Sequence, residues 1–68
     1  MKELSVSSRI IKSVFFSQTD GQLRISFKNG EERLFQDVPE QAAMAMVGSS
    51  SPGQHYLDNI RPQFKRVR

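Results

Sequence analysis

The chain has 68 residues, no cysteine, one histidine and a formal net charge of +3. A single domain of this size buries only about 60% of the surface that its unfolded chain exposes, and without disulfides or zinc a small apolar core must hold it. The sequence has no apolar run of the roughly 18 residues that suggest a membrane span, and no signal-peptide pattern at its start. We expect one cytoplasmic domain over residues 1–68 and no membrane partner, which fits the lack of cysteine.

Two strands are expected in the first half of the chain. Residues 9–17, RIIKSVFFS, are rich in β-branched and aromatic side chains, as strands are. A turn follows at Asp20-Gly21, where glycine supplies backbone freedom. Residues 22–28, QLRISFK, then alternate apolar and polar side chains, which predicts a strand with one face in the core and one in water.

Asn29-Gly30 predicts a tight hairpin turn, because both residues tolerate a positive φ and they lie between alternating segments. The segment EERLFQDV forms the returning strand. A two-residue type I′ loop would leave Phe35 on the solvent face beside Arg24, whereas a three-residue loop with Gly30 as a bulge would place Phe35 beside Leu23 in the core. One residue of register reverses every side chain, so the sequence leaves the register and the exposure of Phe35 open.

A first helix is expected in the segment DVPEQAAMAMVG. Asp37 can cap its start, Pro39 is tolerated in the first turn, and Gly48 can end it. The spacing places three apolar side chains on one buried stripe: Ala43, Met46 and Val47. Core filling explains the methionines better than an adaptable binding groove does.

A second helix is expected after the run of serines. Ser51 and Gln54 fit a capping box, and Pro52 fits the first helical position. Pro62 ends this helix, since proline cannot continue it. Three of its side chains can face the sheet: Tyr56, Leu57 and Ile60.

The last residues alternate Phe64 and Val67 around two bases, which predicts a short extended tail lying on the domain with its bases turned outward. Together the elements predict an α+β fold. It consists of a three-stranded antiparallel meander followed by two short helices packed on one face, in the order β-β-β-α-α.

The motifs of the chain follow a specific order. Two serines precede the first strand, L-x-I-x-F is followed by NG, VP begins a helix, and S-x-G-x-x-Y is followed by Ile60, Arg61 and Phe64. This order resembles the KTSC domain, a short module named for its occurrence at the C-terminus of some lysyl-tRNA synthetases. The resemblance covers residues 6–64, and members of the family also occur as free-standing single-domain proteins.

One segment departs from the pattern of that family. Where the resemblance places a Tyr-x-Tyr pair just before Val-Pro, this chain has Arg33, Leu34 and Phe35. Hydrogen bonding by two tyrosine hydroxyls is lost. Stacking on nucleic-acid bases is retained, because Phe35 keeps an aromatic face and the guanidinium of Arg33 can lie flat on a base. The attachment of the family to a synthetase implies RNA as its ligand.

Positive charge is concentrated at the end of the chain. Residues 1–60 hold six bases and seven acids, a sum of −1, and residues 61–68 add four bases and no acid. This asymmetry favours a polyanion as partner, although a solvated tail would look the same. We expect tRNA-like or single-stranded RNA to bind this basic edge and to stack on nearby rings. The candidate residues are Arg33, Phe35, Tyr56, Arg61, Lys65, Arg66 and Arg68.

The segment GSSSPG is a candidate anion site, because hydroxyls and backbone N–H groups before a helix N-terminus favour phosphate. The residues concerned are Ser50, Ser51 and Gly53. The segment lacks the lysine and the spacing of a P-loop, and helix capping by itself explains the last serine.

The sequence does not favour an enzyme. Nucleophilic catalysis needs a base beside a serine or cysteine, and the one histidine, His55, lies at the start of a short helix and is better read as a surface or stacking side chain. Glu31 and Glu32 beside the turn are typical of solvated charge, and the ligand count is too low for a metal. A chain this short has little room for a pocket of roughly a few hundred cubic ångströms, so we expect no cofactor and no small-molecule substrate.

A protein-binding module is the alternative hypothesis. Adjacent Phe15 and Phe16 cannot both face one core on a regular strand, so an apolar patch or the free edge of that strand could dock on a larger partner. The basic tail would then serve solubility or contact an acidic partner.

Overall fold

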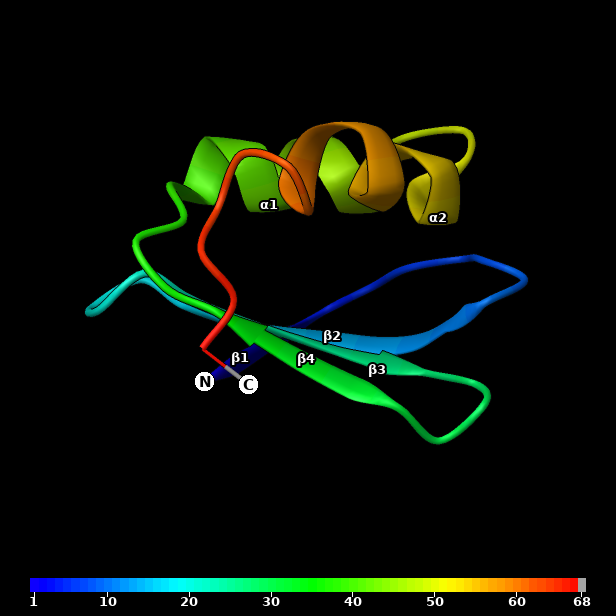
Figure 1. Cartoon of the computed structure of the whole chain (residues 1–68), viewed down its shortest axis with the longest axis horizontal. Helices are drawn as coiled ribbons and strands as arrows, with labels where there is room; N and C mark the ends of the chain where they lie inside the picture. The colour runs from blue at the N-terminus through cyan, green and yellow to red at the C-terminus, as the bar shows by residue number, and fades with distance from the viewer. Residues whose placement is uncertain (68) are drawn as a thin grey trace.

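Residues 1–67 are described by the computed structural model, in which helices cover one face of a four-stranded antiparallel sheet (Figure 1). The elements are β1 (Lys2–Leu4), β2 (Ile11–Ser17), β3 (Gln22–Phe27), β4 (Glu32–Phe35), α1 (Glu40–Val47), α2 (Pro52–His55) and η1 (Tyr56–Ile60). The strands lie in the order β1-β2-β3-β4, so the expected α+β class and meander are confirmed. None of the helices in this part of the chain has the length and apolar content needed to cross a bilayer.

The expected number of strands is wrong, because β1 precedes the three predicted strands. It pairs antiparallel with β2 opposite the segment from Val14 to Phe16. Lys2 and Glu3 are exposed and Leu4 is half-buried, so the three residues carry no alternating pattern that identifies a strand. Pairing with β2 forms this strand. It also covers the edge that the protein-binding alternative had taken as free.

The two adjacent phenylalanines of β2 face opposite sides of the sheet. Phe16 is buried in the core, and Phe15 is half-buried on the face that the helices do not cover, between Glu3 and Arg24 of the neighbouring strands. Ordinary strand alternation therefore places both rings.

The hairpin between β3 and β4 has the three-residue loop. The N–H of Phe27 donates to the carbonyl of Glu31 (2.8 Å), and the N–H of Gly30 donates to the carbonyl of Phe27 (3.0 Å). Gly30 has a φ of +94°, the left-handed backbone that a glycine bulge requires. The two-residue alternative is thus wrong.

This register decides which side chains of β4 face the helices. Leu23 lies opposite Phe35, and Ile25 lies opposite Arg33. Phe35 therefore enters the core, where it is 1% exposed, and Arg33 takes the same face of the sheet. Leu34 points to the uncovered face.

The start of α1 differs from the prediction. Asp37 is not a cap; its backbone is left-handed, with a φ of +57°, and Pro39 takes the N-cap position without a side-chain hydrogen bond. The turn at Asp37 directs Val38 into the core, where its N–H donates to the carbonyl of Gly21 (2.9 Å). The predicted end at Gly48 is confirmed.

The start of α2 lacks the predicted capping box. Pro52 is its first residue, as expected, but the hydroxyl of Ser51 makes no capping hydrogen bond. The side-chain amide of Gln54 instead donates to Asp58 (3.0 Å), one turn further along the helix. Backbone bonds, such as that from the N–H of His55 to the carbonyl of Ser51 (2.9 Å), hold the first turn.

Beyond α2 the helix widens into the π-helical turn η1. The N–H of Arg61 donates to the carbonyl of Tyr56 (2.9 Å), five residues earlier. Tyr56 and Ile60 face the sheet as predicted, whereas Leu57 is 42% exposed. The wider turn rotates side chains relative to α-helical spacing, which is why the α-helical prediction fails at Leu57.

The core lies between the sheet and the helices. Its buried members are Ile11, Val14, Phe16, Leu23, Ile25, Phe35, Val38, Ala43, Met46, Tyr56 and Ile60. Val47, which was expected to be buried, is half-buried and packs at the edge of this cluster.

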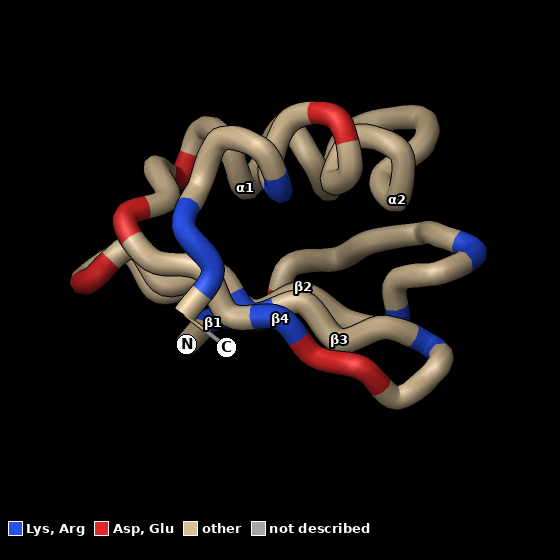
Figure 2. The backbone as a smooth tube through the Cα atoms, viewed as in Figure 1, with Lys and Arg blue, Asp and Glu red and all other residues tan. Residues whose placement is uncertain are grey.

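The tail crosses from the helix layer down to the sheet, where it runs beside β4 (Figure 1). Arg66 forms an antiparallel bridge with Phe35, and the N–H of Gln36 donates to the carbonyl of Lys65 (3.4 Å). The expected extended tail is confirmed for residues 65–67, whereas Phe64 forms a bend whose N–H donates to the carbonyl of Ile60 (3.0 Å), and Arg68 lies outside the described residues. In Figure 2 the basic segments of the tail and of β4 lie side by side.

Gly21 is expected to be sensitive to substitution, because it combines a positive φ with a close backbone approach. Its φ is +67°, and a Cβ built there would lie 3.2 Å from both N and O of Val38. We expect Gly21→Ala to lower the unfolding free energy by about 2–4 kcal/mol, from backbone strain and overpacking combined. Gly30→Ala is the matched control, since Gly30 also has a positive φ but has nothing within 4 Å of its built Cβ. Urea unfolding of both variants measures the difference, and equal losses would contradict a cost of the approach to Val38.

Candidate functional site

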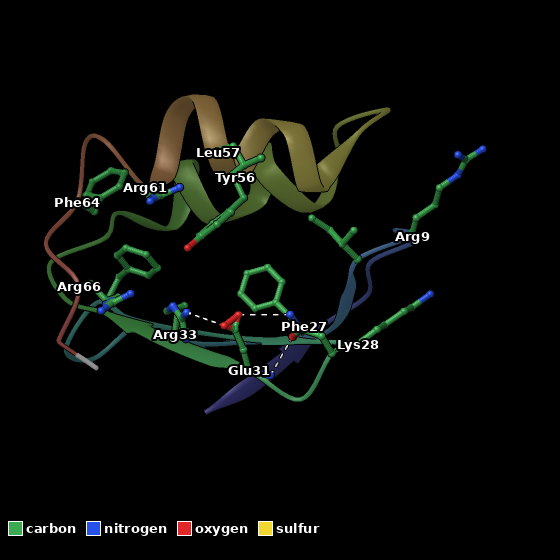
Figure 3. A pocket seen from close by; sticks show the side chains of 13 residues that line it. Arg9, Phe27, Lys28, Glu31, Arg33, Tyr56, Leu57, Arg61, Phe64 and Arg66 are labelled. Carbon is green, nitrogen blue, oxygen red and sulfur yellow. Dashed lines mark hydrogen bonds and ion pairs between the residues drawn. The ribbon is translucent and has the colours of Figure 1, made fainter.

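A groove of about 850 Å³ opens between the β3–β4 hairpin and the helix formed by α2 and η1 (Figure 3). The sheet contributes Phe27, Arg33 and Phe35, and the helix side contributes Tyr56 and Leu57. The expectation that so short a chain has little room for a pocket is wrong. In Figure 1 the β3–β4 hairpin slopes away from the helix layer, and the hollow lies between them.

The groove is strongly basic. Five of its lining residues are bases and one is an acid, which gives 5 − 1 = +4, more than the +3 of the whole chain. The bases are Arg9, Lys28, Arg33, Arg61 and Arg66, and the acid is Glu31. Three of these bases were candidates from the sequence, and the fold brings them together. Lys65 does not line the groove, and Arg68 is not among the described residues.

Arg33, Arg61 and Arg66 reach the groove from three separate segments. Arg33 faces the helices because its strand position is opposite Ile25. Arg61 follows the last residue of η1 and is bonded through its backbone to Tyr56. Arg66 is held beside β4 by its bridge to Phe35. Figure 3 shows the three side chains around one end of the groove, whereas Arg9 and Lys28 lie at the other end.

Glu31 is the one acid of the groove, and it is ionised and bound to Arg33. Nη2 of Arg33 donates to Oε2 of Glu31 (3.0 Å), and the side-chain amide of Asn29 donates to Oε1 (3.3 Å). These contacts lower the pKa of Glu31: the Asn29 hydrogen bond has the largest effect, followed by the hydrogen bond and charge of Arg33, and the charge of Arg66 adds to it. Within residues 1–67 this is the one salt bridge, so Arg61 and Arg66 have no carboxylate partner there.

The aromatic residues at the floor of the groove are less accessible than the sequence suggested. Phe35 is buried, so its face is not available for stacking. Tyr56 is 6% exposed, and its ring makes edge contacts with Phe27 (5.3 Å between centroids) and Phe35 (5.9 Å). The accessible rings are those of half-buried Phe27 and Phe64, which the sequence had assigned to the core and the tail.

The hydroxyl of Tyr56 is the polar group at the floor of the groove. It makes no hydrogen bond with any of the described residues. In Figure 3 it points into the space between Arg33 and Arg61. A nearly buried side chain therefore presents one unpaired polar atom to the groove.

The candidate anion site lines a second hollow of about 530 Å³, together with Arg9 and Lys28. Its features have structural explanations. A Cβ at Gly53 would lie 2.7 Å from the side chain of Ile10, so glycine here lets Ile10 pack on the helix. The N–H of Ser51 donates to the hydroxyl of Ser49 (3.1 Å). Ser50 is exposed beside them, and His55 lines neither hollow.

The sequence pattern of the KTSC domain matches residues 7–64. The chain belongs to the KTSC domain family. The crystal structure of the KTSC domain protein YPO2434 from Yersinia pestis is similar to it, with a TM-score of 0.87 and 24% sequence identity over 98% of this chain and 94% of that chain. At this identity the likeness shows a shared fold. Comparison with curated proteins gives no match.

In this KTSC domain, the segment that departs from the expected Tyr-x-Tyr pair is part of the groove. Arg33 and Phe35 both line it, and Leu34 between them faces away. The sequence analysis did not identify Arg9, Lys28 and Phe27 as members of the site. Each is ordinary in its local pattern, and no local signal shows that they share a groove with the tail.

Proposed function

We propose that this KTSC domain is a non-enzymatic module that binds single-stranded RNA in its basic groove. The observation that carries the proposal is the convergence of Arg33, Arg61 and Arg66 on one hollow that also holds Arg9 and Lys28. Cations gathered along a groove bind the phosphates of a nucleic-acid strand, and they confer affinity rather than sequence choice.

The shape of the groove favours a single strand over a duplex. Its polar and aromatic groups lie in a hollow between two layers, with Tyr56 nearly buried at the floor. A duplex presents a broad convex surface, which cannot bring its phosphates to the floor of such a hollow. A single strand can enter it and place bases against Phe27 and Phe64, the accessible rings.

The test is binding of an internally labelled single-stranded RNA, measured by fluorescence anisotropy at several salt concentrations. For about four phosphate contacts, the slope of log affinity against log salt is expected near −3, from about −0.7 per contact. The triple variant Arg33→Gln, Arg61→Gln, Arg66→Gln is expected to reduce the slope by about 2 and the affinity by about tenfold or more.

The matched control is the triple variant Lys2→Gln, Lys12→Gln, Arg24→Gln. It removes the same charge from residues outside the groove, and we expect it to bind nearly as the parent does. Equal weakening by both triple variants, or binding without salt dependence, would contradict the proposal.

A protein-binding function has one observation in its favour. Ile10 and Leu57, 45% and 42% exposed, both line the groove and the second hollow, so they form an apolar rim between them. A partner retained after nuclease treatment at high salt, with no affinity for RNA, would support this second function in place of the first.

A further inference from the structure

The tail closes one end of the groove, and two bases mark the other end. At one end the tail descends from the helix layer to β4 and closes the space between the layers (Figures 1 and 3). At the other end, Arg9 and Lys28 extend outward (Figure 3), and the segment before β2 lies between the layers: the N–H of Lys28 donates to the carbonyl of Ile10 (2.8 Å), and the side chain of Ile10 packs against Gly53 of α2. A strand that enters along Arg9 and Lys28 cannot continue past the tail. The closed end is therefore shaped for the end of a chain rather than for its middle.

Four donor groups surround this closed end. They are the guanidinium groups of Arg33, Arg61 and Arg66 and the hydroxyl of Tyr56, and we call them the three-arginine corner. Tyr56 is 6% exposed as a residue, but its hydroxyl makes no hydrogen bond within residues 1–67 and is not among the buried polar atoms, so it is a solvent-accessible donor at the floor of the groove. An acceptor bound in the groove can take this donor in place of solvent.

We propose that the three-arginine corner binds a terminal phosphate monoester, so that the domain recognises the phosphorylated end of an RNA strand. The inference rests on the RNA-binding function proposed above and specifies which part of the RNA the groove holds. A phosphate monoester has three terminal oxygens, each able to accept from a guanidinium or a hydroxyl, whereas an internal phosphodiester has two and a single charge.

The charge of the corner matches this ligand. Arg33, Arg61 and Arg66 with Glu31 sum to 3 − 1 = +2. A phosphate monoester carries about −1.5 to −2 at pH 7, so it balances the corner, while an internal phosphodiester leaves about one positive charge uncompensated.

The carboxylate of Glu31 occupies a hydrogen-bond donor of Arg33 that a bound phosphate could use instead. This carboxylate accepts from Nη2 of Arg33 at 3.0 Å, and the hydrogen bond from Asn29, followed by Arg33 and Arg66, lowers its pKa, so it is the anion that pairs with Arg33. A phosphate that binds the corner competes with this carboxylate for Arg33. Removing the carboxylate therefore strengthens phosphate binding, which a role of Glu31 in folding would not produce.

The closing experiment compares oligoribonucleotides of one sequence that carry a 5′-phosphate, a 3′-phosphate or no terminal phosphate, by isothermal titration calorimetry with the full chain. We expect one of the two phosphorylated strands to bind at least about tenfold more tightly than the unphosphorylated strand. A nucleoside monophosphate and inorganic phosphate are titrated alongside, to separate a strand end from a free phosphate as the source of the group. The preference should fall below about pH 6, where the phosphate monoester loses its second charge, while Glu31, with its lowered pKa, remains ionised.

Two single variants are expected to change the affinity for the phosphorylated strand in opposite directions. Tyr56→Phe keeps the ring that packs on Phe27 and Phe35, and it is expected to weaken binding of the phosphorylated strand about tenfold without changing the unphosphorylated strand. Glu31→Gln is expected to strengthen binding of the phosphorylated strand about twofold to fivefold, a gain that unfolding cannot mimic. Arg24→Gln, on the uncovered face of the sheet, is the control and should leave the preference as it is in the parent.

The outcomes separate the two proposals. Equal affinity for all three strands overturns the terminal-phosphate inference and leaves RNA binding in place. Binding of no strand, phosphorylated or not, overturns both. A preference that Tyr56→Phe and Arg61→Gln leave unchanged also overturns the inference, because the phosphate would then be bound elsewhere.

Discussion

Replacing Phe35 with alanine is expected to lower the unfolding free energy by about 3–5 kcal/mol. Phe35 is 1% exposed and is one of the largest fully buried side chains of the domain. It lies opposite Leu23 and packs edge-on against Tyr56. A chain of this length has a total stability of about 3–10 kcal/mol, so the loss is a large part of the whole and should leave a substantial unfolded population.

Leu34→Ala is the matched control for Phe35→Ala. Leu34 is the next residue of β4 and is half-buried on the uncovered face, so its truncation should cost about 1 kcal/mol. Urea unfolding of the two variants measures the difference. A two-residue hairpin loop would exchange the faces of these two side chains, so a larger loss for Leu34→Ala would contradict the observed register.

Changing Arg61 and Arg66 together to glutamate is expected to weaken RNA binding by at least about hundredfold, the largest effect that we predict for any surface change. Each arginine supplies charge-assisted hydrogen bonds worth about 1.5–3 kcal/mol, and each glutamate adds repulsion. Both arginines are exposed and neither has a carboxylate partner within residues 1–67, so the fold should survive the change. Fluorescence anisotropy measures the loss, and an unchanged thermal midpoint verifies the fold.

The control for this reversal is Lys2→Glu with Arg24→Glu, which shifts the net charge equally from positions outside the groove. We expect it to weaken binding only about threefold, because distant exposed charges are screened by salt. If the two double variants lose affinity to the same extent, net charge rather than the groove determines binding.

The success of the sequence-based predictions depends on the range of the interactions behind each feature. The alternation of Leu23, Ile25 and Phe27 identified β3, and Gly48 and Pro52 correctly marked the end of α1 and the start of α2. Those signals are local, since they depend on backbone freedom and on the spacing of side chains. The predicted caps at Asp37 and Ser51 are wrong even so, because backbone turns and tertiary packing took the place of the side-chain bonds.

Interactions between distant residues decided what the sequence left open. β1 is a strand because β2 pairs with it, and no pattern within its three residues shows this. The hairpin register depended on whether Gly30 occupies a bulge, which is settled by burying Phe35 against the helices. The bases of the tail are visible in the sequence, but their places in the fold are not, since Arg66 enters the groove and Lys65 does not.

The sequence by itself determined the α+β class, the strands from residue 11 onward, the KTSC family and the basic character of the end of the chain. The tertiary structure alone decided that Arg33, Arg61 and Arg66 meet around the hydroxyl of Tyr56 at the closed end of a groove. The physical reason is that periodicity and capping act over a few residues. A binding site made from a strand, a helix end and a tail instead depends on strand pairing, helix packing and the path of the chain between them.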